Sequence, residues 1–256
     1  MGSPDDLRRE AAAVTSRLIE VVALHPSDAE NAQAGGADRI QVCAWSNDEP
    51  WSVEPAVVGA IVRAVDVPVR VTLRLSAGFT TQGGEFARLV GLASSYLSAG
   101  VEGFSFGFLT PHLEIDVDLC TSLAQEIGST PWTFDRTFDN ALEASRAWRQ
   151  VRQLPGLDGV HTSGAARGMD AGFDDLLAMA TSDPAFAARV IAAAGTRPEH
   201  VPWLVRAGIT QLHLGALVRP GGSWAKAHVD VGFVRSWRRL LDDALASLTR
   251  SSGAAG

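Results

Sequence analysis

Three absences narrow the class of protein before any motif is considered. Lysine occurs once, at Lys226, in a chain of 256 residues with 22 basic and 29 acidic residues and a formal net charge of −7. The arginines are dispersed among carboxylates and form no basic run, so nucleic acid is not an expected partner. No stretch of eighteen apolar residues occurs, so the sequence predicts no membrane-spanning helix.

Cysteine and the features of a leader sequence are equally sparse. The two cysteines, Cys43 and Cys120, do not make a disulfide framework. Residues 1–17 contain the acidic pair Asp5-Asp6 and lack the basic and apolar regions of a signal peptide. We therefore expect a cytoplasmic protein with no membrane partner.

Eight short apolar runs alternate with helix-like segments along the chain. Alternating strands and helices predict a parallel sheet, and eight of each favour closure into a single (β/α)8 TIM barrel, an α/β fold. An open dinucleotide-binding sheet would want Gly-x-Gly-x-x-Gly after the first strand, where this chain has His-Pro-Ser-Asp at 25–28. We expect the barrel over 18–250, an N-terminal extension over 1–17 with a short helix at 5–16, and a disordered tail over 251–256. The expected strands are 18–24, 37–44, 67–75, 101–109, 132–138, 158–163, 189–194 and 209–216.

Polar residues fall on one alternating face of these strands. In the third strand Val69, Val71 and Leu73 share one face, and Arg70 and Arg74 share the other. Successive side chains of a strand point to opposite faces, and helices cover the outer face of a barrel, so the arginines should point into the interior. The same rule predicts an interior set of Glu20, Arg39, Gln41, Cys43, Arg70, Thr72, Arg74, Ser105, Gly107, Thr133, Asp135, His161, Ser163, Gln211 and His213, with Arg136 near the rim.

Charged groups inside a barrel must be paired with one another, with a ligand or with water. One interpretation is a neutralised structural network in which Glu20 and Asp135 satisfy some arginines. The other is a ligand site at the C-terminal mouth, where barrel enzymes place their chemistry. Arg39 and Arg70 lie early in their strands and favour the structural interpretation. Residues nearer the mouth favour function, namely Arg74, Asp135, Ser163 and His213.

Several motifs together resemble the CutC family. They are Leu-Ile-Glu at 18–20, Gly-Ala-Asp-Arg-Ile-Gln-Val-Cys at 36–43, Thr-Phe-Asp-Arg-Thr-Phe-Asp at 133–139, His-Thr-Ser-Gly at 161–164 and Ala-Gly-Thr-Arg-Pro-Glu at 194–199. The resemblance runs in order over most of the chain. It implies a (β/α)8 barrel, a cytoplasmic setting and a role in copper homeostasis, with copper as the implied ligand.

The resemblance also assigns individual positions. Cys43 matches the family's cysteine in the second-strand motif, a proposed soft metal ligand. The family usually has Glu where Gln41 stands, His where Asp135 stands, and Pro-Arg where Leu75-Ser76 follow Arg74. This chain therefore resembles a divergent member with a redistributed interior charge.

The residues leave the kind of metal open. Cu(I) prefers two or more soft sulfur ligands close together, and the chain offers Cys43, Cys120 and three methionines without a Cys-x-x-Cys or Met-x-x-Met pair. A copper site inside the chain would combine Cys43 with imidazoles such as His161 or His213. A harder divalent ion could use Glu20, Asp135, His161 and His213. Alternatively, the two histidines are hydrogen-bonded residues of the barrel.

A metal-free enzyme is the alternative to a copper protein. Lys226 lies beyond the eighth strand, which argues against a Schiff-base aldolase. Proton transfer stays open, with Asp135 or His213 as base, the other as its partner, and Arg74 binding an anionic substrate. That pattern is typical of a lyase or isomerase acting on a small anionic metabolite, and a non-catalytic metabolite-binding protein is a third class.

Two loops and four tryptophans complete the candidate site. Gly195 and Gly215 follow the seventh and eighth strands, where many barrels hold phosphate, although both also suit plain turns. We expect ligand contacts from Glu20, Arg39, Gln41, Arg136, His161, Ser163, Gly195 and Gly215. Of the tryptophans, Trp45, Trp51 and Trp224 are expected at the mouth or at a homodimer interface, with Trp51 as a lid contact, and Trp203 is expected to pack a helix.

Overall fold

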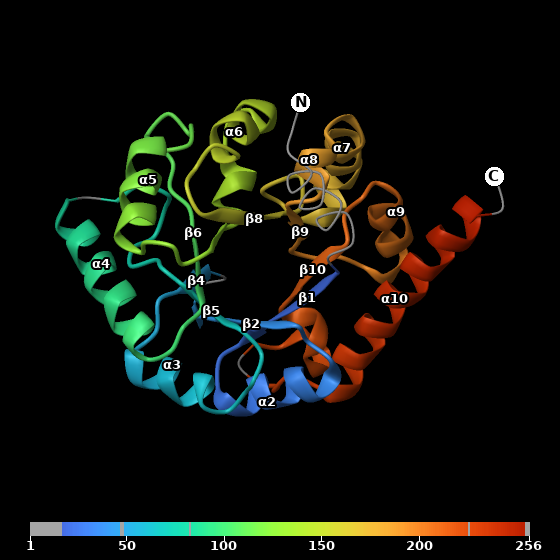
Figure 1. The fold of residues 1–256 in the computed structure, drawn as a ribbon, viewed down its shortest axis with the longest axis horizontal. Coiled ribbons are helices and arrows are strands. Elements are labelled where there is room, and N and C mark those ends of the chain that lie inside the picture. The colour runs from blue at the N-terminus through green and yellow to red at the C-terminus, as the bar shows by residue number, and fades with distance from the viewer. Residues whose placement is uncertain (1–16, 47–48, 82, 225, 254–256) are drawn as a thin grey trace.

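Eight parallel strands close into a barrel with helices around it (Figure 1). The computed structural model describes residues 17–46, 49–81, 83–224 and 226–253, with side chains up to residue 250. The expected helix over 5–16 and the end of the expected tail, 254–256, lie outside the described residues. The sequence-based prediction of a (β/α)8 barrel is confirmed.

The strands follow one another around the barrel in the order β1-β10-β9-β8-β7-β6-β5-β2. Their bounds are β1 Leu18–Ala23, β2 Arg39–Val42, β5 Val69–Thr72, β6 Gly103–Phe106, β7 Trp132–Phe134, β8 Leu157–Thr162, β9 Val190–Ala192 and β10 Gln211–Leu214. The helices are α2 Pro26–Gly35, α3 Pro55–Val62, α4 Gly83–Ser98, α5 Val117–Glu126, α6 Ala144–Val151, α7 Met169–Ser182, α8 Pro184–Ala187, α9 Val201–Arg206 and α10 Val231–Gly253.

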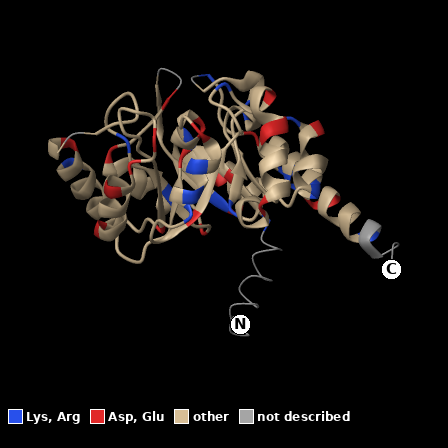
Figure 2. Cartoon of the chain, turned by 90° about the horizontal axis from the view of Figure 1, so that it is seen from above, with Lys and Arg blue, Asp and Glu red and all other residues tan. Residues whose placement is uncertain are grey.

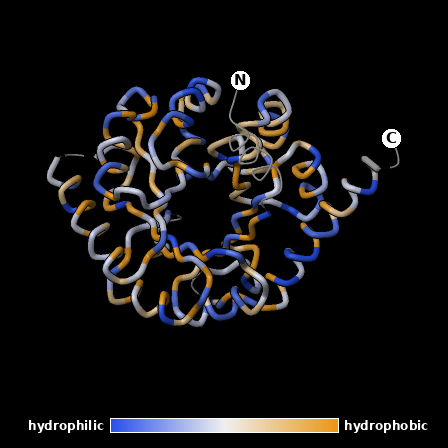
Figure 3. The backbone as a smooth tube through the Cα atoms, in the orientation of Figure 1, coloured by the Kyte–Doolittle hydropathy of each residue, from blue (hydrophilic) through white to orange (hydrophobic). Residues whose placement is uncertain are grey.

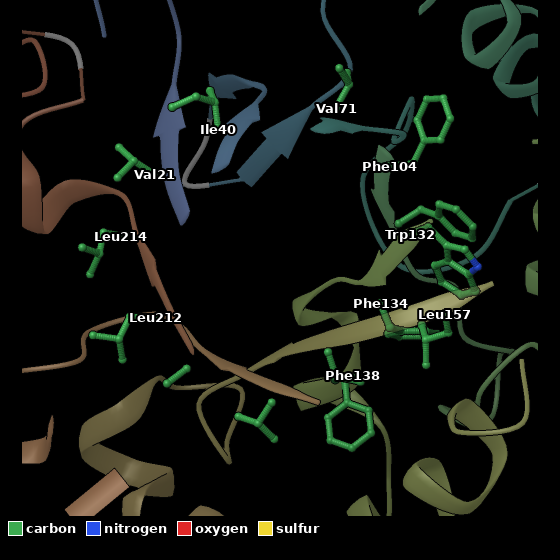
Figure 4. Close-up of a cluster of buried hydrophobic side chains, with 14 of the residues drawn as sticks. Val21, Ile40, Val71, Phe104, Trp132, Phe134, Phe138, Leu157, Leu212 and Leu214 are labelled. Carbon is green, nitrogen blue, oxygen red and sulfur yellow. The ribbon is translucent and has the colours of Figure 1, made fainter. Parts of the chain in front are cut away.

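The main core lies between the outer face of the strands and the helices. Val21, Ile40, Val71 and Phe104 are fully buried and point outward from the barrel (Figure 4). Burying each such side chain contributes roughly 1.5–3 kcal/mol, so the alternating pattern supplies much of the driving force for closure. The helices carry both hydrophobic and hydrophilic residues (Figure 3), as expected when one face packs on the strands.

Local signals set where several elements begin and end. The Asp116 carboxylate accepts a hydrogen bond from the N–H of Leu119 and caps the start of α5. At the end of α2, Gly36 adopts a φ of +99°, a conformation that glycine reaches without steric cost.

The structure corrects the sequence-based boundaries in four places. A hairpin of β3 (Ala44–Ser46) and β4 (Glu49–Trp51) replaces the loop expected after the second strand. The fifth strand ends at Phe134, because Asp135 accepts from the N–H of Thr137 and starts a 3-10 helix, Arg136–Asn140. Helix α10 continues to Gly253, into the segment expected as a disordered tail. The expected packing role of Trp203 is wrong, since its side chain is 54% exposed on α9.

No helix in the described part of the chain is both long enough and apolar enough to cross a membrane. Basic and acidic residues are interspersed over the molecule (Figure 2), in agreement with the dispersed charge of the sequence.

Candidate functional site

A cavity of about 500 Å³ lies at the C-terminal mouth of the barrel. The sequence-predicted residues that border it are Gln41, Cys43, Arg74, Asp135, Arg136, His161, Gly195, His213 and Gly215. Three other predicted residues, Glu20, Arg39 and Ser163, are not part of its lining. Glu20 and Ser163 contact lining residues, and Arg39 contacts Glu20.

Glu20 is the centre of a buried polar cluster on the barrel floor. The parallel register places it beside Arg39 on β2 and beside His213 on β10. Its Oε2 accepts from Arg39 Nε. Its Oε1 lies 2.6 Å from His161 Nε2 and 2.8 Å from His213 Nδ1. One fully buried carboxylate therefore orients a guanidinium and two imidazoles.

The environment of this cluster determines its protonation. Burial alone would raise the pKa of Glu20, but the charge of Arg39 and the hydrogen bonds from the two imidazoles hold it well below the usual value. Burial, together with His213, lowers the pKa of His161 to about 4. An ionised Glu20 can only accept hydrogen bonds, so a neutral His213 carries its proton on Nδ1. Its Nε2 is then a free base on a ring that borders the cavity.

Asp135 forms the acidic counterpart on the opposite side of the barrel. Its side chain is buried, and burial raises the pKa of this carboxyl, although Thr137, Arg74 and Arg136 each act to lower it. Gly107 makes room for it, because a Cβ there would lie 2.7 Å from Asp135 Oδ1. A carboxyl with a raised pKa is suited to donate a proton.

Arg74, after β5, and Arg136, directly after Asp135, both act on the Asp135 carboxyl and are held by their own partners. Arg74 Nη2 donates to the carbonyl of Gly78 at 2.9 Å and pairs with Glu49 at 3.2 Å. Arg136 Nε pairs with Asp139 at 3.0 Å. Among the described residues neither guanidinium makes a hydrogen bond through its Nη1.

Ser163 supports Arg136 from behind the cavity. Its Oγ accepts from Arg136 Nη2 at 3.2 Å and donates to Asp139 Oδ2 at 2.9 Å. The residue that lies near the mouth by sequence thus positions a cavity residue and is itself fully buried.

Cys43 does not form a soft metal site in this structure. Burial raises the pKa of its thiol to about 12, so it is protonated at neutral pH. The other cysteine, Cys120, is buried on α5 in the core between helix and sheet. Cys43 is the only sulfur-bearing residue among the described residues that line the cavity. The donor set therefore does not fit Cu(I), which prefers two or more soft ligands.

The donors of the Glu20 cluster suit a different ion. Ligand atoms of Glu20, His161 and His213 all lie within 4.8 Å of one another, and Cys43 is not part of this group. Two imidazoles and a carboxylate fit a borderline divalent ion such as Cu(II) or Zn(II). Arg39 on the same carboxylate opposes the added positive charge.

The loop glycines have packing reasons of their own. Gly195 adopts a φ of +89°. At Gly215 a Cβ would lie well inside van der Waals distance of the Trp224 ring. Both border the cavity, as expected, but neither position requires a phosphate to explain its glycine.

Sequence reasoning missed part of the cavity wall. Thr137 and Glu49 border it, and Thr137 Oγ1 is buried without a hydrogen-bond partner among the described residues. Gln41 Oε1 is in the same condition, while Gln41 Nε2 donates to Thr72. The signal for Thr137 was the Asp-x-Thr spacing that ends the strand. Unpartnered buried acceptors beside a cavity are what a ligand or water would satisfy.

The comparisons with known proteins agree with these motifs. The model of the CutC family matches residues 17–218. The chain belongs to the CutC family. A CutC family protein of Pasteurella multocida is 30% identical over 200 residues, 77% of this chain and 80% of the relative. The human copper homeostasis protein cutC homolog is 33% identical over 159 residues, 60% of this chain and 57% of the relative.

Solved structures show the same fold. CutC from Streptococcus agalactiae superposes with a TM-score of 0.69 at 16% identity, covering 78% of this chain and 98% of that one. A phosphoribosyl anthranilate isomerase from Thermococcus kodakaraensis has a TM-score of 0.57 at 15% identity, covering 92% and 99%. The human and streptococcal relatives are named as copper homeostasis proteins, and the likeness to the solved structures, at 16% and 15% identity, shows the shared barrel fold.

Proposed function

We propose that this CutC protein is a cytoplasmic enzyme that transfers protons on a small anionic metabolite, as a lyase or isomerase. One observation carries the proposal: His213, oriented by Glu20, and Asp135, with its raised pKa, border the same cavity. An imidazole oriented by a carboxylate and a carboxyl with a raised pKa, both bordering one cavity, are typical of proton-transfer sites.

The roles follow from the contacts. His213 Nε2 takes a proton from the substrate, and Glu20 stabilises the imidazolium that results, as a carboxylate does for a catalytic histidine. Asp135 donates a proton at the other end of the reacting group. Arg74 and Arg136 supply the donors for a carboxylate or phosphate, and Arg39 keeps Glu20 ionised.

Binding of divalent copper is the second candidate. The close donor group of Glu20, His161 and His213 favours it, as does the name shared by the relatives. Those three side chains would hold the ion, and a bound ion would supply Lewis acidity. It would also take the His213 imidazole proposed as the base, so the two functions compete for the same side chain.

Solvent exchange tests the enzyme without a known substrate. We would incubate the protein in D2O with a mixture of small carboxylates and phosphorylated metabolites, and follow loss of carbon-bound protons by NMR. A base that abstracts a carbon-bound proton returns deuterium from solvent. We expect exchange in at least one metabolite, reduced about 100-fold or more in His213→Gln, within the usual contribution of a general base.

The control is Trp203→Phe, a change on the exposed outside of α9 that should leave exchange intact. A metabolite that binds the wild type but shows neither exchange nor turnover would make this a binding protein. A parallel titration with Cu(I) and Cu(II) against a competing chelator, in wild type, Cys43→Ser and His161→Gln, tests copper. Stoichiometric Cu(I) binding lost in Cys43→Ser would contradict the assignment of Cys43 given above.

A further inference from the structure

The tryptophans and the guanidiniums of the cavity wall come from different arcs of the barrel. β10, β1 and β2 are neighbours in the barrel, and β5 to β8 form the facing arc. The arc of β10, β1 and β2 contributes the large apolar side chains Val22, Trp45, Leu217 and Trp224. It also contributes the polar residues Gln41, Glu49 and His213. The facing arc contributes the guanidiniums and the acid, Arg74 after β5 and Asp135 and Arg136 after β7. Phe79 lies beside Arg74 where the arcs meet.

The apolar wall is built around two stacked indoles. Trp45 and Trp224 come from segments 179 positions apart and stack with ring centroids 4.1 Å apart and planes at 13°. Arg219 lies over the Trp224 ring, 5.1 Å from its centroid, and Gly215 leaves the space that this ring occupies. Trp224 is therefore held in place before any ligand arrives. An aromatic wall fixed in this way is suited to a flat apolar surface.

Each guanidinium of the charged arc keeps one terminal nitrogen without a hydrogen bond among the described residues. Nε and Nη2 of Arg74 and Arg136 are engaged by carbonyls and carboxylates, which fixes both side chains. Their Nη1 groups make no hydrogen bond among the described residues, and both arginines border the cavity. Two anchored guanidiniums with unused N–H groups match a carboxylate or phosphate.

From this division we infer the substrate class: a planar aromatic or heteroaromatic ring that carries one carboxylate or phosphate. The ring lies along the Trp45–Trp224 wall, and the anionic group lies at Arg74 and Arg136. A cavity of about 500 Å³ is in the range that encloses molecules of this size. The inference rests on the proposed function, because it names what the same cavity would act on.

Calorimetric titration with matched probes tests it. The probes are indole-3-carboxylate, indole-3-carboxamide, butanoate and phenyl phosphate, which separate ring, charge and type of anion. We expect indole-3-carboxylate to bind at least tenfold more tightly than the amide, which lacks the charge, and than butanoate, which lacks the ring. Phenyl phosphate compared with indole-3-carboxylate shows which anionic group the arginines prefer.

Substitutions in the cavity wall test which side chains cause the preference for a ring-bearing anion. Trp45→Ala should weaken indole-3-carboxylate at least fivefold and leave butanoate unchanged, whereas Arg74→Gln should weaken both. Trp203→Ala, an equal loss of an indole outside the cavity, should change neither, and thermal unfolding checks that each variant is folded. Three results would overturn the inference. They are equal affinity for indole-3-carboxylate and butanoate, no binding of indole-3-carboxylate or phenyl phosphate at 10 mM, and unchanged binding in a folded Trp45→Ala variant.

The same titration in His213→Gln separates this inference from the proposed function. Ring recognition does not need the base, so we expect the tenfold preference to persist there. If the preference for the ring-bearing anion is found but solvent exchange is not, the proposed enzymatic function is contradicted and the inferred ligand class stands. If exchange is found but indole-3-carboxylate and butanoate bind with equal affinity, only the inferred ligand class is contradicted.

Discussion

Arg39 and Arg70 make the most instructive comparison in this barrel, because they are the same residue type on adjacent strands, both pointing inward. Arg70 donates to Thr133 and pairs with Asp158, whose side chain is 41% exposed at the start of β8. Arg39 pairs with Glu20, which is fully buried and shared with His161 and His213. The charge of Arg70 is neutralised by a partly solvent-exposed carboxylate at the far end of the barrel. The charge of Arg39 is neutralised by a buried carboxylate in the cluster under the cavity. The partner carboxylate, rather than the arginine, separates a structural pair from a site.

The largest effect on this comparison should come from Glu20→Gln. The change leaves Arg39 buried without a counter-charge, and breaking a buried pair in this way costs about 3–5 kcal/mol. Urea unfolding measures the loss. In the double variant with Arg39→Met the stranded charge is gone, so we expect part of the stability to return. Additive losses in the double variant would show that the pair is not coupled.

A pH series should show the next largest effect. The pKa of His161 is lowered to about 4 in the folded protein, against a usual value near 6.5. Between those values the unfolded chain binds a proton that the folded chain does not, so stability falls as the pH drops from 6.5 toward 4. At about 1.4 kcal/mol per pKa unit, the loss over this window is about 3 kcal/mol.

The matching variant is His161→Gln, whose amide still donates to Glu20. Its free energy of unfolding should change less between pH 7 and pH 5 than that of the wild type, whereas Arg70→Met should keep the wild-type slope. An identical slope in His161→Gln would assign the acid sensitivity to another group, and His200 is the next candidate because burial lowers its pKa from 6.5.

The smallest effect is expected for Arg70→Met. Asp158 can be solvated once its partner is gone, so we expect a loss of about 2 kcal/mol, the scale of a hydrogen bond to a charged group. Binding of indole-3-carboxylate should be unchanged, because Arg70 does not border the cavity. A binding defect in a folded Arg70→Met variant would erase the distinction between the two arginines.

The sequence predicted the barrel and most of the inward set because both depend on local periodicity. Arg39, Gln41 and Cys43 alternate with Ile40 and Val42, and the structure separates them in the same way. The rule failed where hydrogen bonding to a side chain changed the backbone. Asp135 starts a 3-10 helix, and that turn brings Thr137 to the cavity.

Contacts across the barrel could not be read from one sequence. Glu20 meets residues 141 and 193 positions away, and only closure of the barrel decides that both imidazoles reach one carboxylate oxygen. The hairpin of β3 and β4 was missed because Pro50 lies in it, and proline inside a run argues against a strand unless the strand is at an edge. Trp45 and Trp224 were expected at the mouth, but their stacking was not, and Trp51, expected as a lid contact, is not part of the cavity lining.

The near-absence of lysine has a practical consequence. Lys226 is exposed and lies two residues beyond Trp224, which forms part of the cavity wall. Apart from the N-terminal amine, it is the one primary amine of the chain. With the N-terminal amine blocked, an amine-reactive dye would label the protein two residues from a tryptophan of the cavity wall, so the native chain already carries an attachment point for a fluorescent sensor of whatever enters.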